Sequence, residues 1–200
     1  MRDLSTERLV LRAWTLDDVD FALDLYSRWE VQRFIGRTPQ VLTDRDEAVA
    51  RVERFMALDH PVHGIWLLIE RAGGRRLGTM LLQPIPASGP TLPLRPSGDT
   101  EVGWHLHPDA WGHGYATEAA RRVLEHAGAA GLTRVVAVTH PDNHASQRVA
   151  RRAGMTHQGS TEQYYNARCE LFVAERDPAA GGADEHPGRT RLRSADGGEV

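Results

Sequence analysis

The spacing of apolar residues predicts strands and helices along most of the chain. Segment 7–12 alternates between its two faces, which is typical of a strand with one buried face. Thr15, followed three residues later by Asp18, forms a helix-start signature, so we expect a helix from there to about Trp29. Its buried side is predicted to hold Val19, Ala22, Leu23 and Tyr26.

Thr43 and the acidic residues after it indicate a second helix, since carboxylates stabilise the positive end of a helix dipole. The apolar stripe of this helix contains Ala48, Val49, Val52, Phe55 and Met56. Segments 65–69 and 77–82 flank a glycine-rich turn and are expected to pair as a hairpin. Five prolines between residues 84 and 98 predict an irregular surface loop.

The second half of the chain continues with a strand, a helix, a strand, a helix and a final strand or strands. We expect them at 100–107, within 112–128, and at 135–138, 143–154 and 169–175. The order is not the strict alternation of a doubly wound nucleotide fold, so we predict a different α/β architecture.

One domain is expected over residues 1–176. Residues 177–200 are rich in Gly, Ala, Pro and charge, and Leu192 and Val200 are their only large apolar residues. Such a segment buries too little surface to offset its chain entropy, so we predict a disordered tail.

Composition excludes several kinds of chemistry. All 24 basic residues are arginine, which rules out a lysine-based P-loop, a pyridoxal Schiff base and a kinase-type lysine clamp. Cys169 is the only cysteine, so no disulfide framework forms within the chain. The net charge of −3 does not favour nucleic-acid binding. No apolar run suits a membrane span or a signal peptide, and we expect a cytoplasmic protein.

The stretch after the strand at 100–107 is suited to binding an anion. Gly112 and Gly114 allow close approach to the backbone, and the free N–H groups of the next helix point the same way. A tight turn with two glycines explains this pattern equally well. A dinucleotide fingerprint fits poorly, because its third glycine falls at Thr117.

Two motifs in combination are more informative. The first is the run Trp111-Gly112-His113-Gly114-Tyr115-Ala116; the second comprises Asn143, Ser146, Gly154 and Met155. Together with the opening segment 6–12, they resemble the GNAT superfamily of N-acetyltransferases, in particular its ribosomal-protein alanine N-acetyltransferase branch. The resemblance spans roughly residues 4–175. It implies a mostly antiparallel sheet of about 6–7 strands with about four helices, in which two splayed central strands hold a coenzyme.

The resemblance implies direct acetyl transfer from acetyl-CoA to a primary amine. A backbone N–H near Leu106 or His107 would polarise the thioester carbonyl. The residues implied to bind the coenzyme are Leu106, His107, Trp111, Gly112, His113, Gly114, Tyr115, Ala116, Thr117, Asn143, Ser146 and Arg148.

Glu101 is the candidate general base, since it begins the strand that would carry the thioester. A strand-edge carboxylate paired with an arginine is the alternative explanation. Strand periodicity puts positions 101, 103, 105 and 107 on one face, so His105 or His107 is an alternative proton relay, and a bulge would change this facing.

The general acid is harder to assign. Many superfamily members use a tyrosine on the last helix, but the matching position here is Ala150. Ser146 is the remaining candidate, with its hydroxyl assisting the Asn143 cap as the alternative role. Tyr164 or Tyr165 is a further possible donor. Cys169 reads as a buried strand residue, because direct transfer needs no acyl-enzyme.

The sequence leaves the acceptor open: a protein or peptide N-terminal amine, an amino acid or another small amine, bound by a monomer or a homodimer. Arg28, Arg33 and Arg37 favour an acidic acceptor unless they are simply solvated. The alanine at position 150 also permits a non-catalytic acyl-CoA-binding module. The ten histidines raise the possibility of a metal hydrolase, but no His-Glu-x-x-His spacing occurs and no metal is expected.

Overall fold

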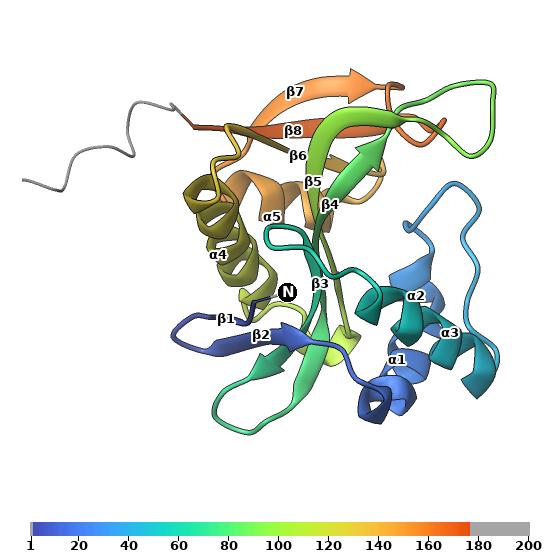
Figure 1. The fold of residues 1–200 in the computed structure, drawn as a ribbon, viewed down its shortest axis with the longest axis vertical. Helices are drawn as coiled ribbons and strands as arrows, with labels where there is room; N and C mark the ends of the chain where they lie inside the picture. The colour runs from blue at the N-terminus through green and yellow to red at the C-terminus, as the bar shows by residue number, and fades with distance from the viewer. Residues whose placement is uncertain (1, 177–200) are drawn as a thin grey trace, which may run out of the picture.

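The computed structural model describes residues 2–176, and its strands form one eight-stranded sheet in the order β1-β2-β3-β4-β5-β6-β8-β7 (Figure 1). The contact between β5 and β6 is parallel, and the other neighbours are antiparallel. The predicted tail at 177–200 lies outside the described residues. The strands are β1 (Leu4–Ser5), β2 (Leu9–Ala13), β3 (Gly64–Glu70), β4 (Arg76–Pro86), β5 (Pro96–Leu106), β6 (Arg134–Thr139), β7 (Thr156–Thr161) and β8 (Cys169–Glu175).

Helices cover both faces of the sheet. Figure 1 shows α1, α2 and α3 on one side and α4 and α5 on the other. Two short 3₁₀ turns, Leu16–Asp18 and Pro108–Ala110, precede α1 and α4. The α-helices are α1 (Val19–Tyr26), α2 (Trp29–Gln32), α3 (Arg45–Met56), α4 (Tyr115–Ala129) and α5 (His144–Arg152).

The central strands separate two apolar cores. In β3, Ile65 and Leu67 pack with α1 and α3, while Trp66 and Leu68 pack in the core that includes α4. Because both faces of β3 are covered, its sequence is a continuous apolar run instead of an alternating one. The predicted α/β class and the mostly antiparallel sheet are confirmed, with more strands and helices than expected.

The proline-rich segment was predicted wrongly as wholly irregular. Pro84 and Pro86 belong to β4 and Pro96 begins β5, so the loop is confined to residues 87–95. The pairing of β3 with β4 ends at Leu82. Beyond that residue, one edge of β4 has no neighbouring strand, so prolines there cost no hydrogen bond on that side.

The first helical region also differs from the prediction. The extended backbone at Arg28 separates α1 from the short α2, so no single helix reaches Trp29. Leu25, and not Leu23, is fully buried, and Met56 is exposed at the end of α3. The short strands β1 and β7 escaped sequence analysis because neither has an alternating apolar pattern long enough to recognise.

Within residues 2–176, no helix is both long enough and apolar enough to cross a membrane.

Candidate active site

The strands β5 and β6 diverge at the centre of the sheet. They pair at a single position, where Glu101 lies opposite Val136. Beyond it, β5 remains paired with β4 as far as Leu106, and β6 remains paired with β8 as far as Thr139. The two strands therefore part toward their carboxyl ends, as the splayed pair was predicted to do.

The backbone of β5 presents donors to this opening. The N–H of His107 donates to the Leu77 carbonyl at 2.9 Å, so it faces β4. N–H groups alternate sides along a strand, so those of Trp104 and Leu106 face the diverging side. The Leu106 carbonyl, on the same side, accepts a 2.9 Å hydrogen bond from the Trp111 indole. Of the two backbone N–H groups predicted as donors, those of Leu106 and His107, only that of Leu106 faces the diverging side. The N–H of Trp104 faces the same side and was not predicted.

A cradle of free N–H groups follows the end of β5. Gly112 and Gly114 both have φ of 80°, a left-handed conformation in which a side chain would be strained. The first intrahelical bond of α4 runs from Glu118 N–H to the Gly114 carbonyl. In the described residues, the N–H groups from Gly112 to Thr117 donate to no other group. Such donors at a helix N-terminus bind anions, and here no lysine is needed.

The side chains of this stretch have other partners. The Tyr115 ring is buried, and its hydroxyl donates to Glu70 at 2.5 Å. His113 stacks on Tyr115, and about half of the Trp111 side chain is exposed. Ala116 and Thr117 are half-buried in the first turn of α4. Any anion here would therefore be bound mainly by the backbone.

An arginine from the first strand region braces the cradle. Arg8 donates to the His113 carbonyl at 3.1 Å and forms a 2.6 Å ion pair with Glu118. Glu118 also accepts hydrogen bonds from the Thr6 hydroxyl and the Arg8 N–H. Sequence reasoning missed this support, although Thr6 and Arg8 lie in the opening segment that carried part of the resemblance.

The helix α5 begins beside the end of β6. Asn143 Oδ1 accepts from the Ser146 N–H at 3.1 Å, so Asn143 caps the helix as predicted. The suggested role of the Ser146 hydroxyl in that cap is wrong, because the backbone makes the bond. In the described residues this half-buried hydroxyl has no hydrogen-bond partner. Arg148 is exposed on α5.

Glu101 is buried where β5 and β6 separate, with a relative exposure of 7%. Its carboxylate accepts hydrogen bonds from the Tyr165 hydroxyl and, at 3.0 Å, from Gln83. Burial raises the pKa of Glu101, while these two donors oppose the increase. The alternative of a carboxylate paired with an arginine is wrong: Glu101 has no ion pair in the described residues.

Tyr165 reaches Glu101 from the turn between β7 and β8. Tyr165 and Asn166 adopt positive φ values of 60° and 53°. The Asn166 side chain accepts from Gly89 N–H at 2.7 Å and donates to Gly89 O at 2.9 Å. Thus the tip of the β4–β5 hairpin holds this turn. Tyr164 points elsewhere and donates to Asp99 at 2.6 Å. Burial and Glu101 raise the pKa of Tyr165.

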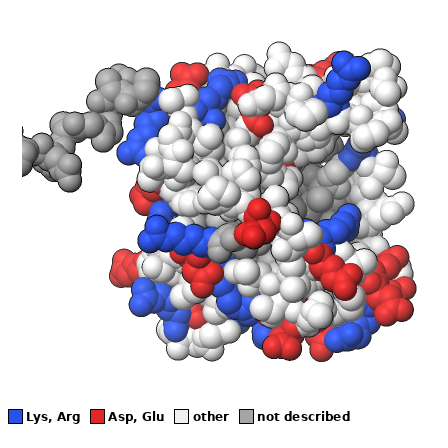
Figure 2. Space-filling model, in the orientation of Figure 1, with Lys and Arg blue, Asp and Glu red and all other residues white. Residues whose placement is uncertain are grey.

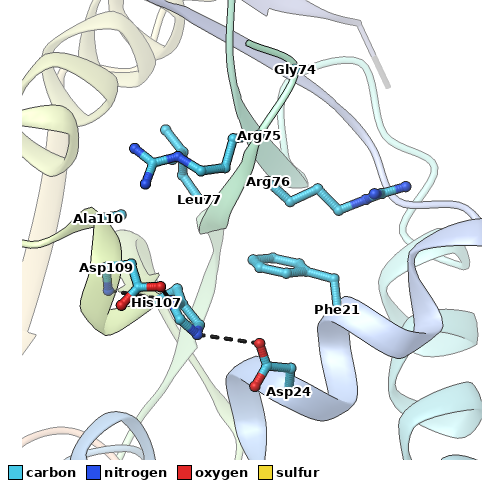
Figure 3. A pocket seen from close by; sticks show the side chains of 9 residues that line it. All are labelled: Phe21, Asp24, Gly74, Arg75, Arg76, Leu77, His107, Asp109 and Ala110. Carbon is cyan, nitrogen blue, oxygen red and sulfur yellow. Dashed lines mark hydrogen bonds and ion pairs between the residues drawn. The ribbon is translucent and has the colours of Figure 1, made fainter.

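The two histidines proposed as relays lie in different surroundings. His105 Nδ1 lies 3.2 Å from the Tyr26 hydroxyl, and burial lowers the pKa of His105 to about 4. His107 Nδ1 accepts from Asp109 N–H, and its Nε2 lies 3.2 Å from Asp24. Figure 3 shows His107 and Asp24 facing each other at a pocket of about 380 Å³ next to α1. The His107 side chain therefore points away from the diverging strands.

A groove runs along the α1–α3 face of the sheet. Leu81, Gln83, Gly103 and His105 on this face are half-buried, so solvent reaches the sheet between the helices and the hairpin. Figure 2 shows the surface hollowed between the β4–β5 hairpin and the segment that follows α2, with acidic and basic side chains mixed on the surrounding surface.

No group of three or more potential metal ligands occurs among the described residues. Cys169 is buried at the start of β8, and burial raises the pKa of its thiol, which disfavours a thiolate nucleophile.

Comparisons with known proteins agree with this geometry. The model of the acetyltransferase (GNAT) domain matches residues 8–156. The chain is 29% identical over 163 residues to the uncharacterized N-acetyltransferase YoaA of Bacillus subtilis, covering 80% of this chain and 86% of YoaA. It is 30% identical over 166 residues to the FsC-acetyl coenzyme A-N(2)-transacetylase of Aspergillus fumigatus. This match covers 82% of this chain and 67% of the Aspergillus protein.

Solved structures share the fold. The ribosomal L7/L12 alpha-N-protein acetyltransferase RimL, in complex with coenzyme A, superposes with a TM-score of 0.71 at 20% identity, covering 88% of this chain and 99% of RimL. An acetyltransferase from Agrobacterium tumefaciens superposes with a TM-score of 0.69 at 24% identity, covering 88% of this chain and 95% of that protein.

Proposed function

This chain belongs to the acetyltransferase (GNAT) domain family, and from that premise we propose that it transfers acetyl from acetyl-CoA directly to a primary amine bound in the same ternary complex. The observation that carries the proposal is the junction of β5 and β6. There the buried Glu101 lies at the base of two diverging strands, whose opening leads to the free N–H groups of residues 112–117.

The chain's groups fit the coenzyme. The N–H cradle with its two left-handed glycines suits the pyrophosphate, and the exposed Arg148 lies on the neighbouring α5. The N–H groups of Trp104 and Leu106 are directed so that they can pair with the pantetheine arm or hydrogen-bond to the thioester carbonyl. Such donors stabilise the negative charge that develops on that oxygen. Asn143 fixes the start of α5, which carries Ser146 in its first turn. Acetyl-CoA supplies the acyl group.

Glu101 is the proposed general base. It accepts a proton from the acceptor ammonium, directly or through water, and leaves a neutral amine whose nitrogen bonds to the acetyl carbon. Burial raises the pKa of this carboxylate, which makes it a stronger base than an exposed glutamate. His105 is uncharged at neutral pH, and its Nδ1 contacts the Tyr26 hydroxyl.

Two hydroxyls are candidates for returning a proton to the coenzyme sulfur when the carbon–sulfur bond breaks. Tyr165 is protonated at neutral pH and contacts Glu101, so its proton can be replaced from the base. Ser146 has a free hydroxyl on α5. Ala150, fully buried where the superfamily often has tyrosine, has no proton to give.

The acceptor is proposed as a primary amine. The names of similar proteins point to different amines: RimL acts on a ribosomal protein, and the Aspergillus relative is named as an N(2)-transacetylase. Protein N-termini, amino acids and other small amines are therefore all included in the proposal.

The test is coenzyme A release from acetyl-CoA on adding a panel of amines to the purified protein. We expect turnover with at least one amine, and about a 10²- to 10⁴-fold loss of kcat/KM in Glu101→Gln with coenzyme affinity kept. The matched control is Glu162→Gln, which changes an exposed carboxylate near the turn between β7 and β8 that carries Tyr165. Coenzyme binding without turnover of any amine would contradict the proposal.

A further inference from the structure

Arg51 lies at the groove on the α1–α3 face of the sheet. Its guanidinium carbon is 4.3 Å from the centre of the Tyr26 ring. The Tyr26 hydroxyl in turn contacts Thr79 at 2.7 Å and His105 Nδ1 at 3.2 Å, on the two strands that form the floor of the groove. Arg51 is also close enough to His105 to lower the pKa of that histidine. The cation therefore lies near His105 of β5, the strand that also carries Glu101.

Arg51 differs from several other arginines in its ionic partners. In the described residues no carboxylate lies within ion-pair distance of it, whereas Arg8, Arg12, Arg28, Arg76 and Arg134 each have one. Its Nε is buried and has no hydrogen-bond partner. Its guanidinium lies within hydrogen-bonding reach of the Tyr26 hydroxyl, and the residue as a whole is half-buried. A half-buried cation without an anion is costly unless a ligand supplies one.

The groups between Arg51 and the sheet are neutral, while Glu47 and Arg54 on its own helix act on it through their charges. Tyr26 stays protonated, since burial raises its pKa to about 12, and His105 is uncharged at neutral pH. The nearest acids have other partners: Glu47 binds the Thr43 N–H, and Glu101 is occupied by Tyr165 and Gln83. Within residues 2–176 this planar guanidinium therefore has no carboxylate at ion-pair distance, and its fork matches the carboxylate of a ligand.

We propose that the acceptor carries a carboxylate close to its reacting amine, as a free amino acid does, and that Arg51 binds this carboxylate while Glu101 receives the amine proton. This inference rests on the proposed function and narrows its acceptor class. Arg51 is not one of the three arginines considered from the sequence. Of those, Arg28 is paired with Asp24, and Arg33 and Arg37 lie in the segment after α2.

The experiment compares amines that differ only in the carboxylate: the amino acids against their amides. Coenzyme A release gives kcat and KM, and calorimetry on the protein saturated with coenzyme A gives Kd. We expect the acid of a pair to bind about tenfold or more tightly than its amide, the size of one charge-assisted hydrogen bond. Arg51→Met keeps an apolar chain over Tyr26 and should remove this preference. Arg54→Met, an exposed neighbour on α3, should keep it.

The outcomes separate this inference from the proposed function. Turnover of acids and amides with equal KM in the wild type overturns the carboxylate inference and leaves the acetyltransferase proposal standing. Tighter binding of acids with no turnover supports the inference and overturns the proposed function. If Arg51→Met does not fold, the wild type is tested with 2-hydroxy acids and their amides as competitive inhibitors. We expect only the acids to inhibit, and equal inhibition by both would overturn the carboxylate inference.

Discussion

Glu101 and Tyr165 form the closest contact between two ionisable groups at the junction of β5 and β6. Their hydrogen bond joins a strand residue to a turn residue 64 positions later in the chain. The bond stabilises the carboxylate and so opposes the increase of the Glu101 pKa that burial causes. The two side chains therefore act as one unit, in which each sets the proton affinity of the other.

Tyr165→Phe removes this hydrogen bond and the phenol proton together. The base functions only when Glu101 is ionised, so kcat/KM falls as pH decreases through the Glu101 pKa. Without the donor that pKa rises, and the acidic limb of the pH profile should move to higher pH. If Tyr165 is also the acid, kcat at neutral pH should drop by about 10²-fold or more. The measurement is kcat/KM against pH for the wild type and the variant.

Ser146→Ala is the companion experiment. A fall of kcat in this variant with an unmoved acidic limb would assign the proton return to Ser146 instead. An unchanged pH profile in Tyr165→Phe would contradict the coupling between Tyr165 and Glu101.

At the scale of elements, the long β4–β5 hairpin supports the turn that carries Tyr165. Its tip bonds to the turn through Ser88, Gly89 and Asn166. Pro84, Pro86 and Pro96 belong to the strands that lead to this tip, and Pro90 and Pro93 lie in the loop between them. We therefore predict that the hairpin positions Tyr165 beside Glu101.

Asn166→Gly tests that role while keeping a residue that tolerates positive φ. It deletes the two side-chain bonds to Gly89, which should lower the free energy of unfolding by about 1–2 kcal/mol. We also expect kcat to fall, because Tyr165 loses its fixed position, while the Kd for acetyl-CoA stays the same. Urea unfolding and steady-state kinetics measure both effects. Full kcat in a destabilised variant would show that the hairpin supports stability alone.

The start of α4 has its own support in Arg8 and Glu118. Glu118→Gln removes the charge that holds the Arg8 guanidinium against the His113 carbonyl. The N–H cradle should then be less ordered, and the Kd for acetyl-CoA should rise by about tenfold, the loss of roughly one charge-assisted hydrogen bond. Titration calorimetry with acetyl-CoA checks this. Glu125→Gln, a change at an exposed position on the same helix, should leave acetyl-CoA binding unchanged. If acetyl-CoA binding weakened equally in both variants, the effect would come from the net charge of α4 and not from the Arg8–Glu118 ion pair.

At the scale of the whole molecule, Asp18 joins distant parts of the chain. This fully buried carboxylate forms 2.7 Å ion pairs with Arg12 of β2 and Arg76 of β4, and it accepts hydrogen bonds from Thr15. Burial by itself raises the Asp18 pKa, but the arginine and Thr15 hydrogen bonds outweigh it and leave the pKa below its usual value. Asp18 thus ties the start of α1 to the sheet.

Asp18→Asn should lower the free energy of unfolding by about 3 kcal/mol at pH 7, because two arginines lose their anion. In the wild type, Asp18 has a lowered pKa, so its contribution is complete above the unfolded-state value of about 4 and is lost as pH falls below it. The difference between wild type and variant should therefore shrink in acid. Urea unfolding from pH 7 to pH 3 measures it, with the exposed Asp17→Asn as control. A difference independent of pH would contradict the ion-pair explanation.

The sequence by itself determined the family, the order of most elements and the glycine turn that opens α4. Those features depend on local spacing: apolar periodicity, the glycines at 112 and 114, and the Asn143 cap all act within a few residues of each other. Even there, local signals misjudged the prolines at 84–98, because whether a proline costs a hydrogen bond depends on which strand lies beside it.

Only the tertiary structure decided which side chains meet at the site. The direction of the Leu106 N–H depends on the pairing of β5 with β4, and the contact of Tyr165 with Glu101 depends on two turns far apart in the chain. The absence of a carboxylate at ion-pair distance from Arg51 among residues 2–176 is likewise visible only once the helices and strands are placed around it. Such contacts are set by long-range packing, which a pattern along the chain does not encode in any single segment.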